Sequence, residues 1–148
     1  MSAHTRRIKA MQALIAGSAL ASRASFGTII NELDEVSQAG KISRNGRKQL
    51  LQVLHSTRAL DTSLKELIAH HGITGVRQAL GGYLHGFSNH RIAGLAQLPH
   101  AQCTHYQNAI VNNRNHYMHS AGAFPANNTE IQNLLSEMQN CLIDVLSL

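Results

Sequence analysis

The sequence predicts an all-α fold, a single domain built as a bundle of four or five helices. Its 148 residues are the length of one ordinary domain, and the 43% of hydrophobic residues supply a core for it. The chain has only two prolines and few runs of β-branched residues, which argues against an all-β sandwich or barrel. Apolar residues instead recur three and four positions apart, as they do on the buried face of a helix.

The first two expected helical segments lie near the N-terminus. One covers about residues 4–23, and the other begins after residues 25–27 and stops at 39–40, where the sequence reads Ala-Gly. The two could also form one long bent helix, and the pattern leaves both arrangements open. The supporting apolar positions are Ile8, Met11, Ile15 and Ala19 in the first segment, and Ile29, Ile30, Leu33 and Val36 in the second.

The next helix is expected to begin at Ser43 as its N-cap and to end at His71 and Gly72. The polar run at residues 61–63 leaves room for a break within it. Residues 73–88 predict a shorter helix, and residues 89–98 predict a loop or a loose turn. The apolar positions of the long helix are Leu50, Leu51, Val53, Leu54, Leu60, Leu64, Leu67 and Ile68.

Two further helices complete the bundle. Pro99 suits the first turn of a helix that runs to about Ala121 and is closed by Gly122 and Pro125. Asn128 or Thr129 is the expected cap of the last helix, which has the clearest helical periodicity in the chain. The apolar stripe of that helix consists of Ile131, Leu134, Leu135, Met138, Cys141, Leu142, Val145 and Leu146.

The N-terminal segment also has the outline of a signal peptide, since Arg6 and Arg7 precede a weakly apolar run that ends near Ala21. The helical spacing of its apolar residues favours a core helix instead, so we expect a cytoplasmic protein. No stretch approaches the length of a membrane span. Cys103 and Cys141 belong to no CxxC pair and are expected to be buried and reduced.

The charge is unevenly distributed. Residues 1–100 hold twelve basic and five acidic side chains, whereas residues 101–148 hold one and three, and the whole chain carries +5. Such an excess attracts a polyanion, of which nucleic acid is the most common; the alternative is a solvated basic face without a partner. The basic residues form two clusters, Arg6, Arg7 and Lys9, and Lys41, Arg44, Arg47 and Lys48.

Common catalytic motifs are absent from the sequence: it has no Walker-type phosphate loop, no Gly-x-Gly-x-x-Gly after a strand and no His-Glu-x-x-His. Gly81, Gly82 and Gly86 favour close helix packing over phosphate binding. The ten histidines lack zinc-site spacing. His116 and His119 could share a metal but would need two more ligands, so we expect neither a metal nor a cofactor.

Residues 111–122 are densely polar although apolar neighbours place them on a helix. Asn115 and His119 are four residues apart and share one face, and the long side chain of Arg114 can reach them. This group suits a phosphodiester, since an imidazole can take the proton of a ribose 2′-hydroxyl while a guanidinium stabilises the charge on the phosphoryl oxygens. Because the substrate supplies the nucleophile, such RNA cleavage needs no metal.

The Arg-Asn-x-x-x-His motif at 114–119, followed by a proline-containing loop and an amphipathic last helix, resembles the HEPN superfamily, whose signature is Arg, four to six residues, then His. The resemblance covers about residues 99–146. It implies an all-α bundle that dimerises through the motif helix, so that both motifs line one cleft. Many members are metal-independent endoribonucleases of toxin–antitoxin or phage-defence systems, and others are inactive binding modules.

The resemblance also implies roles for individual residues. Arg114 would bind phosphate and stabilise charge, His119 would be the general base or acid, and Asn115 would orient the motif or contact substrate. His116 is a neighbour of the motif that would contact the substrate. His119 is followed by Ser-Ala rather than by the His-x-Tyr pattern of some toxins, which puts regulation by modification of that tyrosine in doubt.

We therefore expect a HEPN-type endoribonuclease that acts as a homodimeric toxin or defence effector, with an antitoxin or regulator as a further partner. Arg44, Arg47 and Lys48 would hold the RNA backbone. Two alternatives are an inactive HEPN adaptor that binds RNA or nucleotides, and a helical interaction protein such as an antitoxin or a regulatory subunit.

Overall fold

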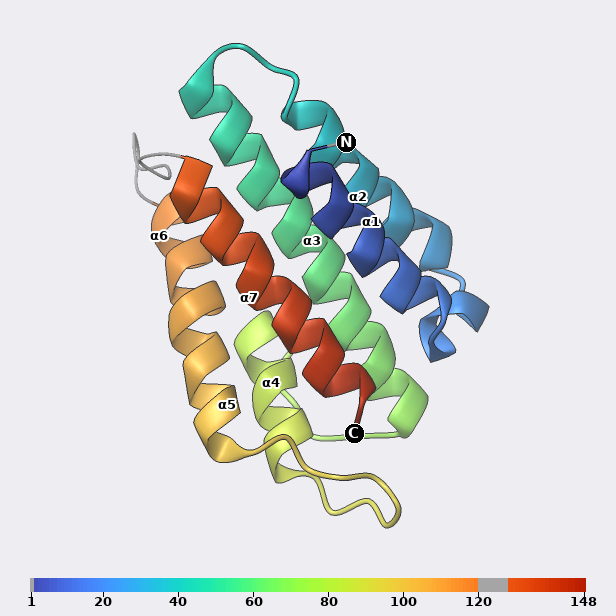
Figure 1. The fold of residues 1–148 in the computed structure, drawn as a ribbon. Coiled ribbons are helices and arrows are strands. Elements are labelled where there is room, and N and C mark those ends of the chain that lie inside the picture. Colours follow the sequence, from blue (N-terminus) through green and yellow to red (C-terminus); the bar gives the residue numbers. More distant parts are fainter. Residues whose placement is uncertain (1, 120–127) are drawn as a thin grey trace.

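The computed structural model describes residues 2–119 and 128–148, and all regular structure in these residues is helical, which confirms the all-α prediction (Figure 1). When α5, η2 and α6 are taken as one continuous rod, this part of the chain has six main helices, more than the four or five expected. The elements are α1 (Ala3–Ala16), the short 3-10 helix η1 (Ala19–Ser22), α2 (Phe26–Ala39), α3 (Asn45–His71), α4 (Leu80–Asn89), α5 (His100–Tyr106), the π-helical segment η2 (Gln107–Asn112), α6 (Asn113–His119) and α7 (Asn128–Leu146).

The additional helix arises because the N-terminal segments are separate. The first ends at Gly17, well before residue 23, and Ser18 then caps η1, its hydroxyl donating to the Ile15 carbonyl at 2.7 Å and accepting from the Leu20 N–H at 3.2 Å. The chain turns, and α2 runs back beside α1 (Figure 1). The alternative of one long bent helix is therefore wrong.

Helix α3 lies at the centre of the bundle and contacts α2, α4, α6 and α7. It continues unbroken through residues 61–63, where the buried Ser63 hydroxyl donates to the Ala59 carbonyl at 2.7 Å. The predicted break is thus absent. Ser43 is not the N-cap, because the helix starts at Asn45 and places Arg44 in that position; Gly72 ends the helix as expected, with φ of +72°.

Residues 73–79 are not helical, so α4 begins at Leu80 and is shorter than expected. The preceding segment packs so closely on this helix that a Cβ on Gly82 would lie 2.1 Å from the Arg77 carbonyl oxygen, and one on Gly86 would lie 2.5 Å from Val76 Cγ1. The glycines therefore permit close packing, as predicted. Residues 90–98 form the expected loop, and Pro99 directly precedes α5.

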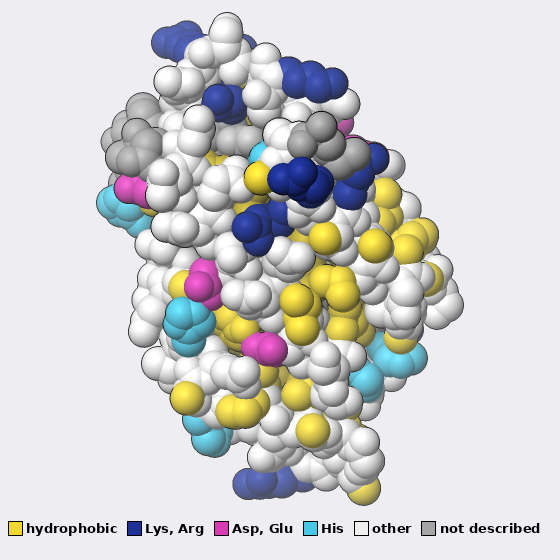
Figure 2. All heavy atoms as spheres, in the orientation of Figure 1, with side chains coloured by type: hydrophobic (Ala, Val, Ile, Leu, Met, Phe, Trp, Pro, Cys, Tyr) yellow, Lys and Arg dark blue, Asp and Glu magenta, His cyan; other side chains and the backbone are white. Residues whose placement is uncertain are grey.

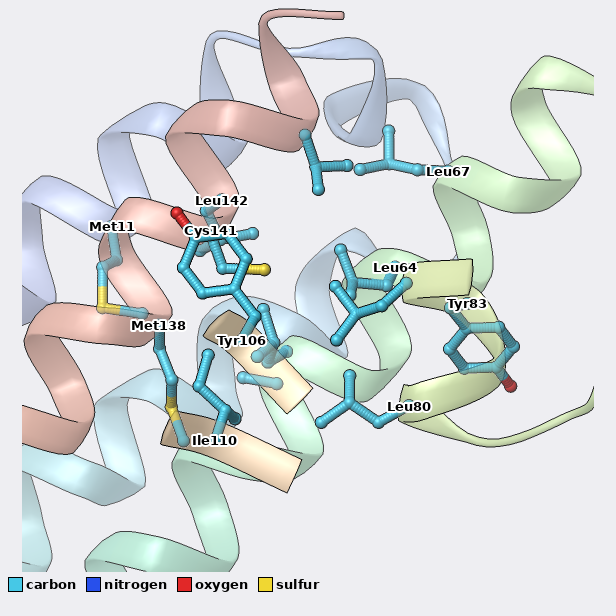
Figure 3. Close-up of a cluster of buried hydrophobic side chains, with 14 of the residues drawn as sticks. Met11, Leu64, Leu67, Leu80, Tyr83, Tyr106, Ile110, Met138, Cys141 and Leu142 are labelled. Atoms are coloured by element: carbon cyan, nitrogen blue, oxygen red, sulfur yellow. The ribbon is translucent and has the colours of Figure 1, made fainter. Parts of the chain in front are cut away.

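The core is formed by the apolar faces of helices far apart in sequence, and Figure 3 shows side chains of α1, α3, α4, α7 and the α5–η2 rod meeting in one cluster. The predicted stripe of α7 is buried from Ile131 to Val145, and Leu146 is partly buried. Cys103 and Cys141 are both free and buried, as expected. None of the described helices is long and apolar enough to cross a membrane.

Helix α7 already includes Asn128 and Thr129, so neither residue is its N-cap. The rod of α5, η2 and α6 is described as far as His119. The predicted end of that helix at Ala121, and its closure by Gly122 and Pro125, lie outside the described residues.

Candidate functional site

One residue from each basic cluster of the sequence, Arg7 and Lys48, lies near enough to His4 to act on it electrostatically. The His4 ring contacts Gln132 of α7 at 3.2 Å and Gln52 of α3 at 3.4 Å, so it joins three helices. Burial lowers the pKa of His4, a backbone hydrogen bond to Val36 opposes this, and the charges of Lys48 and Arg7 lower it further. Lys48 and Arg7 come from the two different basic clusters, so the ends of α1 and α3 share one electropositive region.

Helix α6 ends at the same end of the bundle, beside the start of α7 (Figure 1). The Tyr117 hydroxyl donates to Glu130 Oε2 at 3.1 Å and so joins these two helix ends. Arg44 and Arg47 are exposed where α3 begins, while Lys48 is half-buried. Figure 2 shows Lys and Arg side chains gathered over this half of the visible face. The structure thus places the end of the motif helix and the predicted RNA-backbone residues at one end of the molecule.

The motif residues keep the predicted helical arrangement. Because α6 is helical from Asn113 to His119, Asn115 and His119 lie on one face. The Arg114 guanidinium donates from Nη1 to Asn115 Oδ1 at 3.0 Å, and both side chains are half-buried. His119 and His116 are exposed, and the His116 ring lies 5.5 Å from the Tyr117 ring.

The structure therefore brings together only part of the predicted site. Arg114 and Asn115 are in direct contact. Within the described residues, no hydrogen bond or ion pair connects Arg114 to His119, His116, Arg44, Arg47 or Lys48.

Arg114 lines a polar cleft of about 430 Å³ between α2, α3, α6 and the segment before α4. The sequence analysis did not identify this cleft, because three of its walls come from residues far from the motif. It is lined by Thr28, Glu32, Thr57, Arg58, Asp61, Thr62, Gln78, Ala79, Leu80 and Arg114.

The two carboxylates of the cleft have different surroundings. Glu32 contacts His55 Nδ1 at 2.8 Å and Arg58 Nη2 at 2.9 Å. Asp61 makes no hydrogen bond and no ion pair within 4 Å to any described residue. Burial raises the pKa of Asp61, while the positive charges of Arg114 and Lys65 act in the opposite direction. Asp61 and Arg114 are thus close enough to interact electrostatically, with no ion pair between them.

Asp61 is the functional candidate that sequence reasoning missed. No acidic residue lies near the motif along the chain, whereas Asp61 belongs to α3 and reaches Arg114 through the packing of α3 on α6. The sequence does contain a pattern that could have indicated Asp61. Asp61 is an acidic residue between the core positions Leu60 and Leu64 of a predicted core helix.

The π-helical segment η2 directly precedes the motif helix and was also not predicted. Such segments are frequent at functional sites, and their wider turns change the phase of a helix. A regular α-helical period continued from α5 beyond Tyr106 would therefore assign the wrong residues of α6 to the face that packs on α3. The side chain of Asn113, the first residue of α6, donates to the Ala109 carbonyl of this segment at 2.8 Å.

Across residues 2–119 and 128–148, no group of three or more His, Cys, Asp or Glu side chains could hold a metal ion. Comparison with known proteins adds no further assignment: no family model, no curated protein and no solved structure matches this chain.

Proposed function

We propose that the protein is a metal-independent endoribonuclease of the HEPN type. The observation that carries the proposal is the position of the motif: Arg114, hydrogen-bonded to Asn115, lines a polar cleft, and the exposed His119 follows on the same helix. From Arg114, which lines the cleft beside residues 57–62 of α3, helix α6 runs toward the end of the bundle where α3 begins with Arg44 and Arg47, and where a polyanionic substrate is attracted. No other polar cluster in the described chain combines these features.

The proposed reaction uses the ribose as nucleophile. The His119 imidazole takes the proton of a 2′-hydroxyl, the 2′-oxygen attacks phosphorus, and the bond to the 5′-oxygen breaks as that oxygen takes a proton from water. The protonated His119 then returns its proton to the hydroxide that is formed. The products carry a 2′,3′-cyclic phosphate and a 5′-hydroxyl. The Arg114 guanidinium stabilises the charge on the phosphoryl oxygens, and Asn115 holds the guanidinium through the 3.0 Å hydrogen bond.

Substrate binding is assigned to the side chains around the motif. Arg44, Arg47 and Lys48 neutralise backbone phosphates, a contribution that does not depend on sequence. His116 is exposed next to the motif and contacts the substrate from the same helix. The HEPN resemblance supports a homodimer in which two α6 helices meet, working in the cytoplasm as a toxin or defence effector under an antitoxin or regulator.

The decisive experiment is incubation of purified protein with total RNA and transfer RNA in excess EDTA. We expect the wild type to cleave with cyclic-phosphate ends, and Arg114→Ala and His119→Ala to be inactive. His70→Ala is a matched control, since His70 is an exposed histidine at the far end of α3.

Light scattering at micromolar concentration tests the dimer, and a species of 16.1 kDa alone would exclude a cleft shared between two protomers.

The other outcomes of the same experiment are informative. RNA binding without cleavage, lost in Arg114→Ala, would replace the nuclease by a binding adaptor. Neither cleavage nor binding would contradict the proposal and favour an interaction protein, whose function would depend on apolar surface rather than on Arg114 and His119.

A further inference from the structure

Asp61 and Arg114 line the same cleft with opposite charges, and neither side chain neutralises the other by direct contact. A guanidinium has five N–H donors, and the hydrogen bond to Asn115 occupies one of those of Arg114. The remaining donors are available to an anion. Asp61, in the lining of the same cleft, offers a hydrogen-bond acceptor.

The second carboxylate of the cleft cannot serve a ligand in the same way. Glu32 is held by His55 and Arg58, at 2.8 Å and 2.9 Å, and its side chain is only 13% exposed. Asp61 is half-buried and has no such partners among the described residues. A carboxylate without an ion-pair partner that shares a cleft with an arginine is typical of a binding site.

The volume and the lining of the cleft limit the size and the chemical class of a ligand that could bind there. About 430 Å³ falls within the range of about 300–1,000 Å³ found for small-molecule sites. Thr28, Thr62 and Gln78 add polar groups to the walls. A simple anion would be attracted by Arg114 but repelled by Asp61, so the ligand that uses both carries a phosphate and, a few bonds away, an N–H or O–H donor.

We propose that this cleft is a subsite for a single nucleotide, with the phosphate on the Arg114 guanidinium and a hydrogen-bond donor of the base or ribose on the Asp61 carboxylate. The choice of a nucleotide rests on the proposed ribonuclease function, because a nucleotide is the unit of that substrate. In RNA cleavage Asp61 would thus bind the nucleotide adjacent to the scissile phosphate.

The test is the binding of two probes, nucleoside 5′-monophosphates and inorganic phosphate, to the full chain without metal. We expect the wild type to bind a monophosphate more tightly than phosphate. Asp61→Asn should weaken nucleotide binding by about tenfold or more, since it removes a charged acceptor. The same variant should bind phosphate equally well or more tightly, because a repelling charge is gone. Arg114→Ala should lose both ligands.

Glu35→Gln is the matched control, because it removes one negative charge from an exposed position on α2 that does not line the cleft. Circular dichroism and thermal melting establish that each variant is folded. Equal weakening of both ligands in Asp61→Asn would overturn the subsite and make Asp61 a positioning residue for Arg114. No effect on either ligand, or wild type that binds nucleotides no better than phosphate, would overturn it as well.

The experiments distinguish failure of the nucleotide subsite from failure of the ribonuclease function. RNA cleavage by wild type without mononucleotide binding would exclude the subsite and leave the nuclease. Mononucleotide binding that depends on Asp61, without any RNA cleavage, would retain the subsite and exclude the nuclease.

Discussion

Helix α7 and the rod formed by α5, η2 and α6 run side by side in opposite directions, yet they differ in what holds them (Figure 1). Helix α7 buries seven side chains in one regular stripe. The rod buries Cys103, Tyr106 and Ile110 in its first part, whereas α6 buries none. In the last turns of the rod, Tyr117 and Met118 are only partly buried against the core. The exposed side chains of these turns remain available for a substrate.

The contacts between the two helices change along their length in the same way. Near the start of the rod, Tyr106 is buried and its hydroxyl donates to Asp144 of α7; burial and this hydrogen bond raise the pKa of Tyr106. Near the end of the rod, the contact between the two helices is instead the exposed hydrogen bond that the Tyr117 hydroxyl donates to Glu130. The end of the two helices with Tyr106 and Asp144 therefore stabilises the fold. The end with Tyr117 and Glu130 can hold catalytic side chains without loss of core packing.

The largest expected effect is at the polar end. His119→Ala and Arg114→Ala should each lower the rate of RNA cleavage by about 10²–10⁴-fold, the usual contribution of a general base or of a charge-stabilising donor. Because neither side chain is buried, the melting temperature should change by only a few degrees. Cleavage rates and thermal melts of the same preparations test this separation. A large loss of melting temperature in either variant would show that the polar end is structural.

At the apolar end we expect the reverse. Leu142 of α7 is 1% exposed, and Leu142→Ala should lower the free energy of unfolding by about 2–5 kcal/mol. The neighbouring Ile143 is 40% exposed, so Ile143→Ala should change the free energy of unfolding by only about 0.5 kcal/mol. Urea unfolding measures both. Equal destabilisation by the two substitutions would mean that Ile143 is covered, for example by a second protomer.

A smaller effect concerns the basic end beyond the motif. Replacing Arg44, Arg47 and Lys48 together by alanine should reduce the slope of log affinity for single-stranded RNA against log salt by about 2, since each phosphate contact contributes about 0.7. Arg91→Ala is the control, because Arg91 is exposed in the 90–98 loop at the other end. Binding titrations at several salt concentrations give the slope. An unchanged slope in the triple variant would remove these residues from the RNA path.

The smallest effect is a dependence of stability on pH. Burial lowers the pKa of His4, so the unfolded chain binds a proton more readily than the folded chain below about pH 6.5. Stability should therefore fall as the pH is lowered from 7.5 to 5.5. His4→Gln should reduce this loss, whereas His116→Gln, at an exposed position, should leave it unchanged. Urea unfolding at the two pH values is the measurement, and an identical pH dependence in His4→Gln would contradict the assignment.

Sequence patterns alone predict the helical class, the buried stripe of α7, the extent of α2 and the end of α3 at Gly72. These features depend on residues within three or four positions of one another, which a local pattern contains. The helical spacing of Arg114, Asn115 and His119 was also predictable for this reason.

Which residues meet across the bundle follows from tertiary packing and not from local sequence patterns. The separation of α1 from α2 depends on α1 packing on both α2 and α7, and the irregular 73–79 segment depends on its close contact with Gly82 and Gly86. The position of Asp61 in the same cleft as Arg114 depends on how α3 packs on α6 and on the phase change at η2. Such contacts join positions tens of residues apart and are selected by burial of the whole apolar surface, which no local periodicity records.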